Sequence, residues 1–419
     1  MLSVLRTTWP LLLGVLFLMV GNGMQGTLLG VRGQIEGIST YEMSVVMSAY
    51  FAGFLLGSRL VPGMIRNVGH VRVFAALGSM ISAVLIAYAA FPHWLAWVAM
   101  RVLIGFSFSG VYITAESWLN AGVSNAMRGR ALSAYMIVQM IGIIAGQGLM
   151  LVGDPGGYLL FVIPSILVSI AFTPILLSVQ PAPAFGEIQR MSFARLFQAS
   201  PLGMVGMFLM GGVFSALFGM ASVWAMQAGL SVGQTSAFVA AIYIGGLVFQ
   251  FPIGWASDRM DRRVLILGLA VGGALVMALA ALVPLPFPVL LGVAMLVGGV
   301  ANPLYALLIA YTNDFLDNSS MASASAGLMF VNGLGAISGP ILTGWLMEMI
   351  GTEGFFVYLV VLFVALAGYA GWRMTRRAAP AVDTTGAFAV LSPAASVVAV
   401  ETALEAAQDD PPFDHRPVP

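Results

Sequence analysis

The densest cluster of ionisable side chains lies in the ten residues Gly254–Arg263, whose sequence is GWASDRMDRR. Two aspartates, Asp258 and Asp261, are interleaved there with three arginines, of which Arg259 is the first. Carboxylates and guanidinium groups at this spacing can form charge-assisted hydrogen bonds with one another or with a second charged loop. The chemistry that they indicate is reversible ion pairing.

The rest of the composition excludes most enzyme classes. All 17 basic residues are arginine, so the chain lacks the lysine of a P-loop ATPase and of a Schiff-base enzyme. With no cysteine and only three histidines, His70, His93 and His415, thiolate nucleophiles, iron–sulfur clusters and cysteine zinc sites are also excluded. The formal net charge is zero, without the basic excess of nucleic-acid-binding proteins. We therefore expect no enzyme activity, no cofactor, no metal and no nucleic-acid partner.

Two further charged residues fall in or next to an apolar run. Arg101 lies about 9 Å inside the outer end of Leu95–Ala115, where an arginine costs ~2.5–3.5 kcal/mol and should face the protein interior or a watery cavity. Bonding to backbone carbonyls of a neighbouring helix and contact with a substrate are both open roles for it. Glu116 could be a proton site, a gate partner of Arg128 or Arg130, or an interfacial residue.

Membrane-spanning helices must position these residues. Hydrophobic residues make up 60% and charged residues 8% of the chain, against about 45–50% and about 25% in soluble domains. Twelve apolar runs, from Trp9–Gly30 to Gly354–Met374, have the length of roughly 20 residues that crosses the hydrocarbon core of a bilayer. They are continuous, which favours helices over the alternating strands of a barrel. The sequence predicts an all-α integral membrane protein with 12 transmembrane helices.

The longest internal connection, Val179–Pro201, divides the chain into two six-helix halves. The halves resemble each other: Gly142 and Gly146 correspond to Gly335 and Gly339, and Gln139 corresponds to Asn332. A duplicated six-helix unit predicts this pattern. We expect an N-terminal bundle over residues 1–178, a central cytoplasmic loop over 179–201, a C-terminal bundle over 202–377 and a disordered acidic tail over 378–419. A transient helix over 394–408 is the alternative for part of the tail.

The arginine positions predict the orientation of the chain. The even-numbered connections and the residues that flank the first and last runs hold fourteen arginines, whereas the odd-numbered connections hold only Arg32. Because cytoplasmic loops carry the excess of basic residues, both termini are expected in the cytoplasm.

The stretch Gly254–Arg263 resembles the loop signature of the major facilitator superfamily: a glycine, a small-residue turn, Asp-Arg and a basic pair. Asp261 stands where that family usually has glycine, and Arg66, after the second run, stands where it usually has aspartate. An ordinary positive-inside loop is the alternative. Together with PIGWASDRMDRR, the segments GHVRVFA, AESWLN and NAMRGRALSAY look most like the YcaD-like branch of bacterial facilitators.

The resemblance implies two pseudo-symmetric bundles around a central cavity lined by the first, fourth, seventh and tenth helices. A bond between neighbouring helices is the alternative role for each polar residue on them. With Arg101, the candidates for substrate contact are Asn22, Gln25, Tyr112, Trp224, Gln227, Asn302 and Tyr305.

The resemblance also implies a cytoplasmic gate, because in the family the loops after the second and eighth helices meet the starts of the eleventh and fifth. Each meeting would pair opposite charges across the two halves. Solvated positive-inside charge is the alternative. The predicted gate residues are Arg59, Arg66 and Arg72 against Asp314 and Asp317, and Asp258, Arg259 and Asp261 against Arg128 and Arg130.

These features predict a secondary transporter of a small organic solute that works by alternating access, as a monomer in a bacterial inner membrane. Arg101 favours an anionic or neutral polar solute over a cation. Proton coupling through Glu116, uncoupled diffusion, import and export all stay open. A non-transporting sensor or scaffold with the same fold, whose acidic tail binds partners, is the alternative function.

Overall fold

The computed structural model describes residues 2–123, 125–176, 191–376, 386, 388–393 and 395–409. The regular elements of these residues are all helical. Eleven of the helices are long and apolar enough to cross a membrane, and a twelfth apolar helix, α6, is shorter. The predicted all-α membrane fold is confirmed, with a helix at each of the twelve expected positions.

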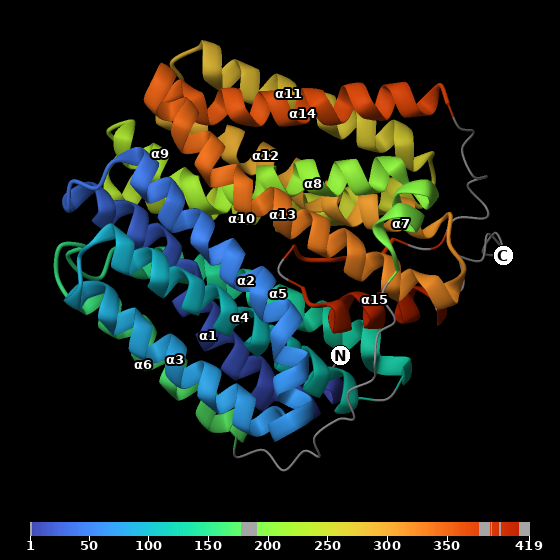
Figure 1. Cartoon of the computed structure of the whole chain (residues 1–419), viewed down its shortest axis with the longest axis horizontal. Helices are drawn as coiled ribbons and strands as arrows, with labels where there is room; N and C mark the ends of the chain where they lie inside the picture. The colour runs from blue at the N-terminus through green and yellow to red at the C-terminus, as the bar shows by residue number, and fades with distance from the viewer. Residues whose placement is uncertain are drawn as a thin grey trace.

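The helices form two halves, which Figure 1 shows as a blue-to-green bundle beside a yellow-green-to-orange-red bundle. The first half contains α1 (Leu2–Ile35), α2 (Thr40–Val68), α3 (His70–Ala90), α4 (Trp94–Ala121), α5 (Asn125–Leu149) and α6 (Leu159–Leu176). The second half contains α7 (Phe193–Ala199), α8 (Pro201–Ser215), the π-helix η1 (Ala216–Met220), α9 (Ala221–Gln227), α10 (Val232–Ser257), α11 (Arg262–Leu282), α12 (Phe287–Asn313), α13 (Asn318–Ile350) and α14 (Glu353–Met374).

Glycines hold equivalent helix pairs together in the two halves. In the first half, α2 and α4 meet at Gly53 and Gly105; in the second half, α10 and α12 meet at Gly245 and Gly298. A Cβ atom at any of the four would overlap a backbone oxygen of the facing helix. Small residues allow this backbone-to-backbone approach, which stabilises helix pairs in a membrane by van der Waals contact. The internal repeat is therefore a repeat of helix packing.

The glycines that the sequence matched between the halves show the same equivalence. Gly142 and Gly146 of α5 lie against the backbone of α1, while Gly335 and Gly339 of α13 lie against α8. The fifth and eleventh spans thus pack on the first and seventh spans in the same way.

The two ends of the molecule differ in how closely the halves approach. At one end, the Tyr41 N–H donates to Oε1 of Glu348 at 2.9 Å, and Nε2 of Gln227 donates to the Thr40 hydroxyl. Both bonds join the two halves, so we call this the closed end. The opposite end carries the start of α5 and the junctions of α2 with α3, α10 with α11 and α12 with α13; we call it the arginine-rich end.

The C-terminal segment departs from the sequence prediction. Its described residues end in α15 (Val397–Asp409) and bury apolar side chains, with Leu391 2% and Val400 0% exposed. Disorder over 378–419 is therefore wrong for these residues, and the alternative helix over 394–408 is close to α15. The reason is that the acids gather near the chain end, while Phe388–Val400 (FAVLSPAASVVAV) is apolar enough to be buried.

Candidate functional site

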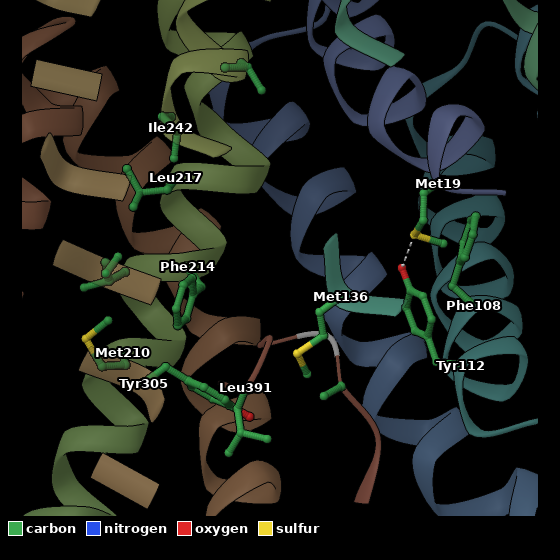
Figure 2. Packing of buried hydrophobic residues seen from close by; sticks show 14 of the residues in the cluster. Met19, Phe108, Tyr112, Met136, Met210, Phe214, Leu217, Ile242, Tyr305 and Leu391 are labelled. Atoms are coloured by element: carbon green, nitrogen blue, oxygen red, sulfur yellow. Dashed lines mark hydrogen bonds between the residues drawn. The ribbon is translucent and has the colours of Figure 1, made fainter. Parts of the chain in front are cut away.

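A cavity of about 540 Å³ lies between the two halves and extends to the arginine-rich end. Helices α1, α2, α4 and α5 line it from the first half, and α8, η1, α10, α12 and α13 line it from the second. In Figure 2, Met19 and Tyr112 stand on one side of this region and Phe214 and Tyr305 on the other. A site between two repeats is where a rocking-bundle transporter holds its substrate.

Six of the eight predicted cavity residues line this space: Asn22, Gln25, Arg101, Tyr112, Asn302 and Tyr305. They reach it from α1, α4 and α12, which are the first, fourth and tenth of the spans that the resemblance implied. Whether they touch a substrate stays a prediction.

Trp224 and Gln227 lie elsewhere, so their placement in the cavity was wrong. Trp224 packs against Phe355 and Phe356, with ring centroids 5.4 and 4.8 Å away, and Gln227 bonds Thr40 at the closed end. Both belong to α9, which follows the π-helix in the seventh span and runs where the halves are in contact.

The π-helix is a feature of the seventh span that the sequence analysis did not anticipate. It follows α8 directly, and Phe214 and Phe218, on either side of its start, line the cavity with stacked rings 5.7 Å apart. Single π-turns inside α-helices occur frequently at functional sites. Here the turn presents aromatic faces from the second half to the cavity.

Arg101 is 4% exposed, and its partners are a thioether and an aromatic ring. Its Nη2 donates to Sδ of Met47 at 3.0 Å, and its guanidinium carbon lies 5.0 Å from the ring centroid of Tyr50. Its Nε has no hydrogen-bond partner among the described residues. A thioether is a weak acceptor, and a buried donor without a partner is costly. An anionic ligand oxygen is the acceptor to which this guanidinium group is best suited to donate.

Neutral polar groups also line the cavity. Nδ2 of Asn22 donates to the Tyr112 hydroxyl at 3.0 Å, and that hydroxyl lies 3.3 Å from Sδ of Met19. The Gln25 carbonyl oxygen and the Tyr305 hydroxyl have no partner among the described residues. Buried polar groups usually have partners, so these two atoms are available to orient a ligand.

Several lining residues were not among the predicted candidates. Gln139 and Asn332 line the cavity from α5 and α13, and their match in the internal repeat was the signal that could have selected them. Aromatic residues of α2 and α10 also line it, including Tyr50, Phe54 and Tyr243. Within a continuous apolar run, a cavity-facing aromatic residue looks the same as a lipid-facing one, so sequence alone gave no signal for these.

Glu116 is 2% exposed, and both of its carboxylate oxygens have partners. Oε1 accepts from the Tyr135 hydroxyl at 3.2 Å, and Oε2 accepts from the Ser396 N–H at 2.9 Å. Arg128, a gate partner considered for it, instead bonds Glu405 at 3.2 Å. The C-terminal segment therefore supplies the groups that Glu116 and Arg128 were expected to find elsewhere.

The other gate residues also differ from the predicted pairs. Asp314 accepts from Arg262 at 2.6 Å with both side chains at most 4% exposed, and the Arg59 guanidinium lies 4.0 Å from the ring centroid of Phe330. The Asp258 carboxylate accepts the Phe388 N–H at 2.8 Å. The predicted residues do gather at the arginine-rich end: Arg66 is in the last turn of α2, Arg72 is in the first turn of α3, Arg130 is near the start of α5, Arg259 follows α10 and Asp317 precedes α13.

Two of these aspartates have shifted pKa values. Burial raises the pKa of Asp314 although Arg262 opposes the shift. Partial burial also acts to raise the pKa of Asp261, but hydrogen bonds from the side chain and backbone of Arg263 outweigh it and lower that pKa. Asp261 is the N-cap of α11, which is the role it takes where the family usually has glycine.

A cavity between two equivalent six-helix halves that are joined at one end defines a membrane transporter of the alternating-access class. The chain matches a family model described as Major Facilitator Superfamily over residues 11–246 and 203–413. It belongs to that superfamily and is a secondary transporter rather than an enzyme.

Known relatives agree with this assignment. The uncharacterized MFS-type transporter YcaD of Escherichia coli (strain UTI89 / UPEC) is 27% identical over 384 residues, which cover 86% of this chain and 94% of the relative. The same protein from Escherichia coli O157:H7 (strain EC4115 / EHEC) matches at 27% identity with the same coverage.

Solved structures share the fold. A mutant form of the nucleoside transporter NupG superposes with a TM-score of 0.75 at 18% identity, covering 87% of this chain and 99% of that one. A bacterial homologue of the human lysosomal transporter Spinster, in an inward-facing and occupied conformation, gives 0.71 at 15% identity, covering 89% and 97%.

Proposed function

We propose that the chain transports a small organic anion that carries an apolar or aromatic portion. The observation that supports this most directly is the charge of the cavity: Arg59, Arg66 and Arg101 line it, and its described lining includes no aspartate or glutamate. A cleft lined by charges of one sign concentrates ligands of the opposite sign.

The size and the aromatic lining support the second part of the proposal. A cavity of about 540 Å³ falls within the roughly 300–1,000 Å³ of small-molecule sites. The rings of Phe218 and Tyr243 are stacked 4.6 Å apart on its wall, and offer an apolar surface to the uncharged part of a ligand. The carboxylate or equivalent group would then lie near Arg101.

The orientation of the protein in the membrane is also part of the proposal. We place the arginine-rich end, the central loop and both termini in the cytoplasm of a bacterial inner membrane, because basic loops stay on that side. The structure then corresponds to the inward-facing state of a monomer. Reporters can be fused at Gln189 and Pro380, both outside the described residues. A green fluorescent protein fused there should fluoresce, and a periplasmic phosphatase fused there should be inactive. The reverse pattern at either site contradicts this orientation.

Glu116 supports a proposal of proton coupling. It is a buried carboxylate on a cavity-lining helix, bonded to Tyr135 and to a backbone N–H, and carboxylates in transporters commonly relay protons. Uptake by proteoliposomes should then respond to an imposed pH gradient, and Glu116→Gln should abolish that response while leaving exchange without a gradient intact. An unchanged response in Glu116→Gln contradicts the assignment.

The anion proposal is tested with three ligands of similar size and different charge: benzoate, benzamide and benzylammonium. Binding stabilises a protein by RT ln(1 + [L]/Kd), roughly 2.7 kcal/mol at a hundredfold excess over Kd. The purified protein should melt at a higher temperature with benzoate, less so with benzamide and not with benzylammonium. Stabilisation by the cation equal to or above that by the anion contradicts the proposal.

A further inference from the structure

We propose that the C-terminal segment, meaning the described residues between 386 and 409, is an autoinhibitory plug. It docks between the two halves at the arginine-rich end and stops the transport cycle until it leaves. This inference rests on the alternating-access mechanism of the superfamily and does not depend on the identity of the solute.

The first part of the plug is bound by the second half. The Arg262 guanidinium donates to the Gly386 carbonyl oxygen, and Asp258 accepts the Phe388 N–H at 2.8 Å. Further along, Nε2 of Gln250 lies 3.5 Å from the Leu391 carbonyl oxygen. Each contact is made by a side chain of α10, α11 or the turn between them to the backbone of the plug, so the segment follows a defined path.

The second part of the plug is bound by the first half. The Ser396 N–H donates to Glu116 of α4 at 2.9 Å, and Glu405 forms an ion pair with Arg128 of α5 at 3.2 Å. Figure 1 shows α15, in red, lying between α5 and α13, and it contacts α4, α5 and α13. The plug therefore bridges the two halves.

The plug is held by apolar burial as well as by hydrogen bonds. Ala399 and Val400 are buried on one face of α15. Ala403, about one helical turn further along, is buried on the same face. Leu391 is buried before the helix begins, and in Figure 2 the Tyr305 side chain points toward it. Removing this apolar surface from water is favourable, so burial stabilises the docked position of the plug.

The location of the plug conflicts with closure of the same end. In alternating access, the halves rock about the central site until the end that was open is shut. An α-helix with its side chains is about 10–12 Å across, and α15 occupies the space into which α5 and α13 would have to move. The docked plug and the state closed at this end exclude each other.

The plug also occupies groups that the closed state would use. Asp258 and Arg128 are predicted gate partners of each other, and in the docked state both bind the plug. Ser392, Ser396 and Val398 line the cavity itself, so the plug narrows the route from the cavity to the arginine-rich end. Docking thus opposes both gate closure and solute passage.

The test measures how far apart the halves are at the arginine-rich end, which needs no solute. The chain has no cysteine, so spin labels can be attached at Asn67→Cys and Met260→Cys, two exposed positions at this end of α2 and after α10. Val400→Asp in the full chain places a charge at a fully buried position. Val400→Thr is the matched control, because it keeps the shape without the charge.

In the wild type and in Val400→Thr, we expect a single population in which the spin labels at positions 67 and 260 are far apart. In Val400→Asp the equilibrium constant for docking should fall by about tenfold or more, which corresponds to at least about 1.4 kcal/mol, and a population with a shorter distance should appear. A second label pair at Ile35→Cys and Met349→Cys, exposed at the closed end, should report the opposite change in the same variant. An unchanged distance at both ends overturns the proposal.

Ser396→Pro provides an independent variant in case Val400→Asp does not fold. It removes the N–H that Glu116 accepts, because proline has no N–H, and it also removes the hydroxyl that accepts the Val398 N–H at the start of α15. The same shift toward shorter distances supports the plug; retention of the wild-type distribution contradicts it. If the distances shift while benzoate gives no stabilisation, the anion proposal alone fails.

Discussion

The Ser396 N–H donates to Oε2 of Glu116 at 2.9 Å, which joins the C-terminal segment to a buried carboxylate 280 positions earlier in the chain. The other carboxylate oxygen accepts from Tyr135. Both oxygens of a buried carboxylate are therefore satisfied by the protein. A proton-coupling or gating role of Glu116 would act on a carboxylate that also binds the plug, which links the proposed coupling residue to the position of the plug.

Arg101→Ala should weaken the stabilisation by benzoate without preventing membrane insertion. A hydrogen bond to a charged group contributes about 1.5–3 kcal/mol, so the apparent affinity should fall by roughly tenfold or more, while loss of a buried charge makes insertion easier. Thermal melting of the purified variants with benzoate measures this. Arg72→Ala, which removes the same charge from an exposed position, is the control, and equal affinity in the two variants contradicts a ligand role for Arg101.

Gly298→Ala should destabilise the second half. A Cβ at this position would overlap the Ile242 carbonyl oxygen of α10, and overpacking of this kind costs about 1–3 kcal/mol. Gly292→Ala in the same helix is the control, since nothing lies within 4 Å of its Cβ position and alanine favours a helix. Thermal melting in detergent should show a loss for the first and no loss for the second; similar melting temperatures would mean that α10 and α12 do not approach this closely.

Docking of the plug should depend on pH through Glu401. Burial, and then repulsion by Glu405, raise the pKa of Glu401 above its usual value of 4.5. A raised pKa in the docked state means that docking takes up a proton. Docking is therefore favoured at acid pH and weakens as the pH rises from about 4.5 through the raised pKa.

The spin-label pair at positions 67 and 260 measures this dependence. The short-distance population should grow as the pH rises through that window, and Glu401→Gln, which keeps the neutral form at every pH, should flatten the growth. If Glu401→Gln has the same pH profile as the wild type, another group controls docking.

The predicted gate can be tested by exchanging the charges of its partners once the plug is released. Asp258→Arg should impair transport, and adding Arg130→Asp should restore part of it, because exposed pairs are worth about 0–1 kcal/mol each and several together can bias two states that differ by a few kcal/mol. Arg128→Asp is the parallel rescue, although Arg128 also binds Glu405. If neither double variant recovers activity while all insert normally, the pairing is wrong.

The sequence by itself determined the membrane fold and its division into halves. Continuous apolar length is a local property that a bilayer translates directly into spanning helices, and the matched glycines, such as Gly142 with Gly335, mark positions where helices must approach closely. The six cavity residues came from the resemblance to the superfamily, which implies that the first, fourth, seventh and tenth helices line the centre, and Arg101 also from the cost of placing a charge in the membrane.

Only the tertiary structure decided which side chains meet. The π-helix before α9 and the contact of the halves at the closed end place Trp224 and Gln227 outside the cavity, while Tyr50 faces it from a run that could equally have faced lipid. The plug is the clearest case. Because α15 packs against α4, α5 and α13, the burial of Val400 depends on a surface that exists only after the two halves have come together.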